Sequence, residues 1–81
     1  SIAPEGKSEE KALVKMADKI SAYLKCLEET KAGNTEFRLA LEGKLEELSH
    51  MENAELQYFM KNILPVYSKS LDELQIAVDI S

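Results

Sequence analysis

The only histidine of the chain, His50, is the first candidate for acid–base or metal chemistry, because an imidazole transfers protons near neutral pH and is a common metal ligand. It lies among acids, with Glu46 one helical turn before it and Glu52 shortly after it. A metal site of defined geometry needs several converging ligands, and neither a second histidine nor a suitably spaced cysteine is present. We therefore predict a structural or solvated histidine and no metal site.

The segment Ser49–Asn53 resembles the phosphoacceptor box of dimeric histidine kinase bundles, in which a helical histidine is followed by an acid that helps to activate it. In that box the acid comes directly after the histidine, and a proline follows a few residues later. Here the acid is Glu52, and Ala54 stands near the place of the proline. The resemblance implies a phosphotransfer or sensor-type bundle that uses His50 as an alternative function, and we assign no family from it.

Cys26 and the paired carboxylates are the other candidates for catalysis. A reactive thiol needs a helix N-terminus, a histidine or dense positive charge beside it, whereas Cys26 lies between Lys25 and the acids that begin at Glu28. Adjacent acids such as Asp72 and Glu73 point in different directions on a helix. The chain also lacks a glycine-rich phosphate loop and a nucleophile elbow. These observations predict a passive, half-buried thiol, no catalytic residue, no cofactor, and a protein that is not an enzyme.

Four lysines recur at every fourth position near the start of the chain: Lys7, Lys11, Lys15 and Lys19. On a helix they form a basic stripe, which is able to contact anionic lipid or an acidic partner. Because Glu9, Glu10 and Asp18 are interleaved with the lysines, the stripe is more typical of a solvated helix face with salt bridges.

The middle of the chain carries most of the acidity. The formal net charge is -5, and residues 28–55 hold eight acids against three bases. Since duplex nucleic acid is bound by neutralising its phosphates with Lys and Arg, we exclude nucleic acid as a partner. The acids instead suggest a further alternative function, a decoy or regulator that occupies a basic protein surface through Glu36, Glu42, Glu46, Glu47, Glu52 and Glu55.

The length of the chain and its single cysteine limit the number of domains and the compartment that we expect. Eighty-one residues are enough for one domain and too few for two. A lone cysteine cannot form an internal disulfide, which favours a reducing compartment, the cytoplasm. No apolar run approaches the roughly 18 residues that span a bilayer. The chain does not begin with methionine, which we interpret as a sign of a processed product or a fragment of a longer protein.

Three stretches repeat apolar residues at the three-and-four spacing of an amphipathic helix. We predict a flexible lead-in over residues 1–7 and a single helical domain over residues 8–81, with the first helix capped by Ser8 and ending near Lys31. The predicted buried faces consist of Leu13, Met16, Ala17, Ile20, Tyr23, Leu24 and Leu27, then Phe37, Leu41, Leu45 and Leu48, and then Leu56, Met60, Ile63, Tyr67, Leu71, Leu74 and Val78.

Two turns separate these stretches. Gly33 can adopt the left-handed conformation that follows a helix end. The apolar rhythm slips again between Leu48 and Leu56, where Ser49 and Asn53 are candidate caps for a new helix. Antiparallel neighbours follow from such short connections, so we predict an all-α, three-helix up-down-up bundle; the alternative is a long helical hairpin that completes its core as a dimer.

Pro65 lies inside the third stretch, where it removes a backbone hydrogen bond and clashes with the preceding turn. The apolar register agrees on both sides of it, which predicts one kinked helix over Asn53–Ile80. The alternative is a break at Pro65 with a separate last helix capped by Ser68 or Ser70.

The third stretch is apolar beyond one face, and such a helix is usually covered by a further helix or by another chain. Either the first two helices cover the extra flank within the bundle, or the flank binds a partner. The second interpretation predicts a non-catalytic protein–protein interaction or oligomerisation module, with a helical protein or a second copy of the chain (a homodimer) as the partner. The predicted partner-binding residues are Tyr58, Phe59, Val66, Tyr67, Ile76 and Ile80.

Overall fold

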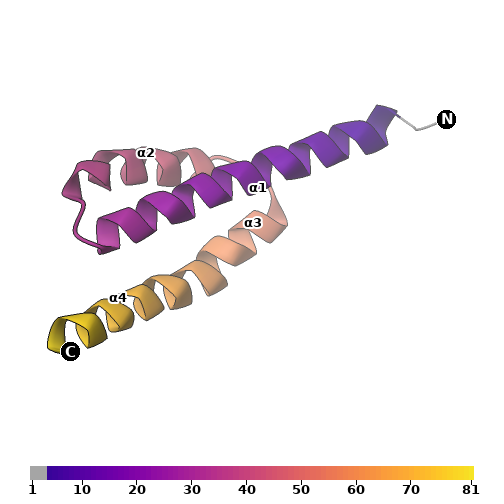
Figure 1. The fold of residues 1–81 in the computed structure, drawn as a ribbon. Coiled ribbons are helices and arrows are strands. Elements are labelled where there is room, and N and C mark those ends of the chain that lie inside the picture. Colours follow the sequence, from indigo (N-terminus) through magenta and orange to yellow (C-terminus); the bar gives the residue numbers. More distant parts are fainter. Residues whose placement is uncertain (1–3) are drawn as a thin grey trace.

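The computed structural model describes residues 4–81, and their side chains from residue 6 onward. They form a three-helix bundle (Figure 1): α1 (Pro4–Lys31), α2 (Arg38–Ser49), and a third helix made of α3 (Ala54–Tyr58), a π-helical turn η2 (Phe59–Ile63) and α4 (Leu64–Ile80). α2 runs back along α1, and the third helix reverses direction again. The predicted all-α, up-down-up bundle is confirmed, and the described residues contain no strand.

The start of α1 differs from the prediction. The helix begins at Pro4, so the expected lead-in is helical from Pro4 onward and Ser8 lies inside the helix. Proline is favoured in the first turn of a helix, where its missing N–H would have no partner in any case. The rest of the predicted lead-in, residues 1–3, lies outside the described residues.

The two predicted turns form where they were expected. Gly33 has a φ of 100° and follows the end of α1, in the left-handed region that a Cβ disfavours. A 3-10 turn, η1 (Thr35–Phe37), then leads into α2. At the second turn Asn53 caps α3, because its side chain accepts a hydrogen bond of 2.9 Å from the Leu56 N–H. Ser49, the other candidate cap, donates back to a carbonyl within α2.

The π-helical turn explains how the third helix passes Pro65. The N–H of Leu64 bonds to the carbonyl of Phe59, five residues earlier, so the turn before the proline is wider than an α-helical one. This relieves the crowding that a proline ring causes in the preceding turn. The helix then continues to Ile80, and Ser70 donates to the Val66 carbonyl within it. The alternative of a separately capped last helix is therefore wrong.

The core lies where the three helices overlap. Its buried side chains are Tyr23, Cys26, Leu27, Leu48, Leu56 and Leu64. Leu48 of α2 and Leu56 of α3 are the most completely buried, each 1% exposed. Cys26, which we predicted to be half-buried, is buried and donates to the Phe37 carbonyl at 3.3 Å. Within the described residues, no helix is long and apolar enough to cross a membrane.

Several residues of the predicted buried faces are exposed, and this corrects the sequence-based core. α1 extends past the other two helices at one end of the bundle, and α4 runs away from α2 at the other (Figure 1). The apolar residues at those ends have no helix beside them, and Leu13, Leu74 and Val78 are more than half exposed. Ile63 in the π-helical turn and Leu45 in α2 are also exposed, although they do not lie at those ends. A chain of this size can hide only a limited share of its apolar surface.

Tyr23 leads to a prediction about alkaline pH. Burial, and secondly the proximity of Cys26, raise the pKa of the Tyr23 phenol above its usual value of 10.0. The folded chain thus favours the neutral phenol. This preference contributes fully to the free energy of unfolding below pH 10.0, and the contribution is lost as the pH rises through the raised pKa. We expect the free energy of unfolding, measured in urea, to fall with pH above this value, and to fall less steeply in Tyr23→Phe. Equal slopes for both proteins would contradict this.

Candidate functional site

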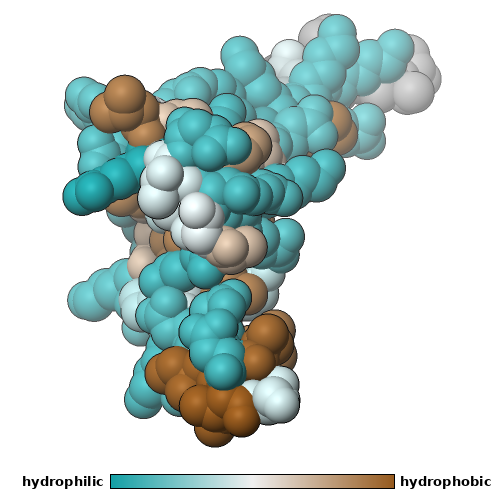
Figure 2. Space-filling view, turned by 60° about the vertical axis from the view of Figure 1, so that its left-hand side comes forward, coloured by the Kyte–Doolittle hydropathy of each residue, from teal (hydrophilic) through white to brown (hydrophobic). Residues whose placement is uncertain are grey.

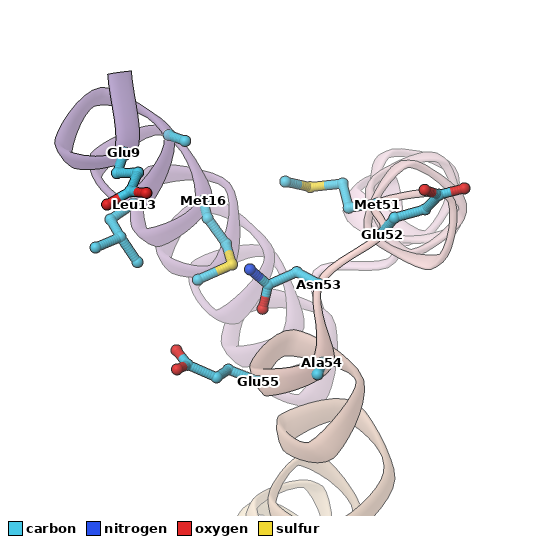
Figure 3. Close-up of a pocket in the computed structure, with 9 residues that line it drawn as sticks. Glu9, Leu13, Met16, Met51, Glu52, Asn53, Ala54 and Glu55 are labelled. Carbon is cyan, nitrogen blue, oxygen red and sulfur yellow. The ribbon is translucent and has the colours of Figure 1, made fainter. Parts of the chain in front are cut away.

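A groove of about 670 Å³ lies between the N-terminal half of α1 and the connection from α2 to α3 (Figure 3). We call it the acidic groove. Its walls are formed by Glu9, Ala12, Leu13, Met16, Met51, Glu52, Asn53, Ala54 and Glu55. In Figure 3, the side chain of Met51 extends toward α1, whereas that of Glu52 points away from it. The groove therefore combines apolar side chains with the carboxylates of Glu9 and Glu55, while the carboxylate of Glu52 is turned away from α1.

The chemistry of the acidic groove is limited by its composition. Among the residues with described side chains, no three histidine, cysteine or acidic side chains lie close enough together to hold a metal ion. The carboxylates that line this groove repel an anion such as a phosphate group, since like charges disfavour each other. An apolar or cationic group fits this groove better than an anionic one.

His50 ends α2. It is exposed, its N–H bonds to carbonyls of the last turn of α2, and its Nδ1 lies 2.7 Å from the carbonyl oxygen of Glu46. With a proton on Nδ1, the imidazole donates to that carbonyl and satisfies one of the unpaired acceptors at the helix end. The structure thus uses His50 as a cap.

A second hollow, of about 280 Å³, lies between α1 and α2. We call it the α1–α2 hollow, and it is formed by Lys15, Asp18, Lys19 and Ala22 of α1 together with Lys44 and Glu47 of α2. It includes two lysines of the predicted basic stripe. Lys19 makes an ion pair with Glu47, as expected for a face with salt bridges. Within the described part of the chain, neither Lys15 nor Lys44 makes an ion pair.

The predicted partner-binding residues divide into two groups. Tyr58, Val66, Ile76 and Ile80 are exposed, and Ile80 is 81% exposed. Phe59 and Tyr67 instead pack against the core. Tyr67 also donates from its hydroxyl to the Glu28 carboxylate on α1, and this bond raises the pKa of the phenol.

The four exposed residues form what we call the apolar flank: Tyr58, Val66, Ile76 and Ile80. Figure 2 shows hydrophobic side chains gathered at the end of α4. The described bundle leaves this flank uncovered, so the interpretation in which the first two helices cover it is wrong.

Comparison with known proteins identifies the family. The chain matches the family of YfbR-like 5'-deoxynucleotidases over residues 2–67. The all-helical fold of residues 4–81 agrees with this match. The chain belongs to the YfbR-like family.

Individual relatives are similar to the chain over most of its length. A 5'-deoxynucleotidase of Klebsiella pneumoniae (strain 342) is 52% identical over 67 residues, which are 82% of this chain and 33% of that protein. A relative of the same name from Yersinia pestis (strain Pestoides F) is 51% identical over 69 residues, 84% of this chain and 34% of that protein. The 5'-deoxynucleotidase plu3092 of Photorhabdus laumondii is 45% identical over 71 residues, which are 88% of this chain and 36% of that protein. The chain thus spans about a third of the length of these relatives. No solved structure matches it.

Family membership overturns the functional predictions made from the sequence. The relatives are enzymes that act on nucleotides, so the predictions of a non-catalytic interaction or oligomerisation module and of a protein that is not an enzyme are wrong. Protein binding and dimerisation as the function are wrong for the same reason, as are the His50 phosphotransfer bundle and the acidic decoy. The separate expectation of a helical partner or a homodimer stays a prediction.

The error has a physical cause. Catalytic groups converge in space from distant parts of a chain, and this chain spans only about a third of its relatives. A search for catalytic motifs within one part of such a fold has no complete site to find. The signal that identifies the family is the similarity spread over residues 2–67.

Proposed function

We propose that this chain is part of a 5'-deoxynucleotidase, an enzyme that hydrolyses the 5'-phosphate ester of a deoxynucleoside monophosphate. The observation that supports the proposal is the family match over residues 2–67, together with about half identity to relatives of that name. Because the chain spans about a third of those relatives, the reacting groups are shared between this bundle and the remaining length of the family's proteins.

A chimera tests this function. In the Klebsiella pneumoniae relative, the matched 67 residues are replaced by the corresponding residues of this chain. We expect the chimera to release phosphate from a deoxynucleoside 5'-monophosphate at a rate within about tenfold of the intact relative, a difference of about 1.4 kcal/mol in the activation barrier.

The control for this experiment is the same relative with the matched segment deleted. A chimera that folds, as judged by circular dichroism and a cooperative thermal transition, but releases no more phosphate than the deletion control would contradict the proposed function.

We further propose that the apolar flank packs against the remaining length of the nucleotidase. Two observations support this occupant: the flank is exposed in the bundle, and about two thirds of the length of the relatives lies outside the matched segment. Soluble proteins rarely expose contiguous apolar surface without a partner for it. The predicted homodimer would cover the same side chains.

The proposed location is the cytoplasm. Cys26 is buried as a free thiol, and cysteines without disulfides are usual in reducing compartments.

A further inference from the structure

Two polar contacts join the last turn of α1 to α4. The Tyr67 hydroxyl donates a hydrogen bond to the Glu28 carboxylate. The ammonium group of Lys31 makes an ion pair of 2.8 Å with the carboxylate of Asp72. We call these two contacts the α1–α4 links. Because both links connect the same two helices, they act together in holding α4 against α1.

The apolar packing of α4 is sparse. Within Leu64–Ile80, all of which the structure describes, Leu64 is the only buried side chain. Tyr67 and Leu71 pack against the core from partly buried positions, and Leu74 beyond them is 62% exposed. Elements with few buried apolar contacts open at a lower free energy than the rest of a protein. The α1–α4 links therefore carry an unusually large share of what keeps α4 in place.

The π-helical turn η2 places a hinge at the start of α4. Its hydrogen bonds are wider than those of an α-helix, and Pro65 has no N–H with which to bond the preceding turn. Such turns are where helices bend sharply. On the other side of η2, Asn53 caps α3, and Leu56 is anchored in the core with 1% exposure. α3 is thus fixed on the bundle, whereas α4 is able to change its angle about η2.

We infer that α4 is an arm that opens about η2, and that the α1–α4 links hold it closed on the bundle. In the open state Tyr67 and Leu71 leave the core, and the residues of the apolar flank on α4 move away from α1 with the arm. Partly exposed polar contacts stabilise a folded state only slightly, so the closed state is favoured by a small margin. The arm belongs to this bundle, and the inference does not rest on the proposed function.

The distance between α2 and α4 measures the opening of the arm. Nitroxide labels are attached at Glu46→Cys on α2 and Glu73→Cys on α4, two exposed positions, in a Cys26→Ala background that removes the native thiol. Pulsed electron paramagnetic resonance is expected to show a major short distance and a minor longer one. The double variant Lys31→Gln/Tyr67→Phe, which keeps the aromatic ring, is expected to raise the ratio of the open to the closed population about tenfold.

Two further variants make this test specific. Lys31→Gln alone removes one link and is expected to raise the ratio about threefold, which keeps the test decisive if the double variant does not fold. Arg38→Gln is the matched control, because it removes an ion pair of 3.8 Å with Glu42 within α2 and leaves both links intact. It is expected to change the ratio by no more than about twofold. A single α2–α4 distance that loss of the links leaves unchanged would overturn the arm, and equal opening in Arg38→Gln would overturn the role of the links.

A second pair of labels locates the hinge. Glu46→Cys is combined with Glu55→Cys, an exposed position on α3, in the same background. Since α3 lies on the core side of η2, the α2–α3 distance is expected to stay a single population in the double variant. If the α2–α3 distance broadens together with the α2–α4 distance, the whole third helix leaves the bundle and a hinge at η2 is wrong.

Discussion

Leu56→Ala is expected to lower the free energy of unfolding by about 2–5 kcal/mol, the range for truncating a buried leucine. Leu56 is 1% exposed and belongs to the same buried cluster as Leu48 of α2 and Leu27 of α1, so its side chain joins all three helices. Small domains are stable by only about 5–15 kcal/mol, and this chain has few buried residues. The variant is therefore expected to be partly unfolded at room temperature, as measured by urea denaturation followed by circular dichroism.

Leu39→Ala is the matched control for this prediction, because it makes the same chemical change at an exposed position. Leu39 lies on α2 and is 81% exposed. Its truncation is expected to change the free energy of unfolding by no more than about 0.5 kcal/mol. If both variants lose the same stability, the third helix does not pack on the other two as described.

The paired substitution Ile76→Asp/Ile80→Asp is expected to affect the isolated chain and the chimera very differently. Both side chains are exposed in the isolated bundle, at 60% and 81%, so the free energy of unfolding of this chain should change by no more than about 1 kcal/mol. In a chimera that also carries residues 68–81 of this chain, which lie beyond the family match, two carboxylates become buried without partners if the remaining nucleotidase covers the flank. That costs at least about 3 kcal/mol and is expected to lower the melting temperature sharply.

Two further measurements separate the occupants of the flank. Asn62→Asp is a control that adds a charge at an exposed polar position on the same helix, and it is expected to leave the chimera stable. Sedimentation of the isolated chain tests the alternative occupant. If the isolated chain is a dimer that Ile76→Asp/Ile80→Asp dissociates, while the chimera tolerates the change, then a second copy covers the flank and packing against the nucleotidase is wrong.

Apolar periodicity and turn residues were sufficient to predict the helices of this chain. The spacing of Ile20, Tyr23 and Leu27 requires one helical face, and Gly33 and Asn53 mark the turns on either side of α2. These features depend on interactions within a few residues of each other, so they can be recognised without knowing what each helix packs against. The same is true of the connections, which are too short for anything but antiparallel neighbours.

The contacts between helices decided which side chains are buried, how the third helix passes Pro65 and which residues line the hollows. Leu48 and Leu74 both occupy predicted buried faces, yet one is 1% exposed and the other 62%, because burial depends on where the helices overlap. The π-helical turn before Pro65 keeps the third helix continuous, a choice that a local rule for proline leaves open. Lys15 and Lys44 face one hollow only because α2 folds back on α1. Periodicity within a segment carries no information about such distances between segments, and catalytic function depends on those distances.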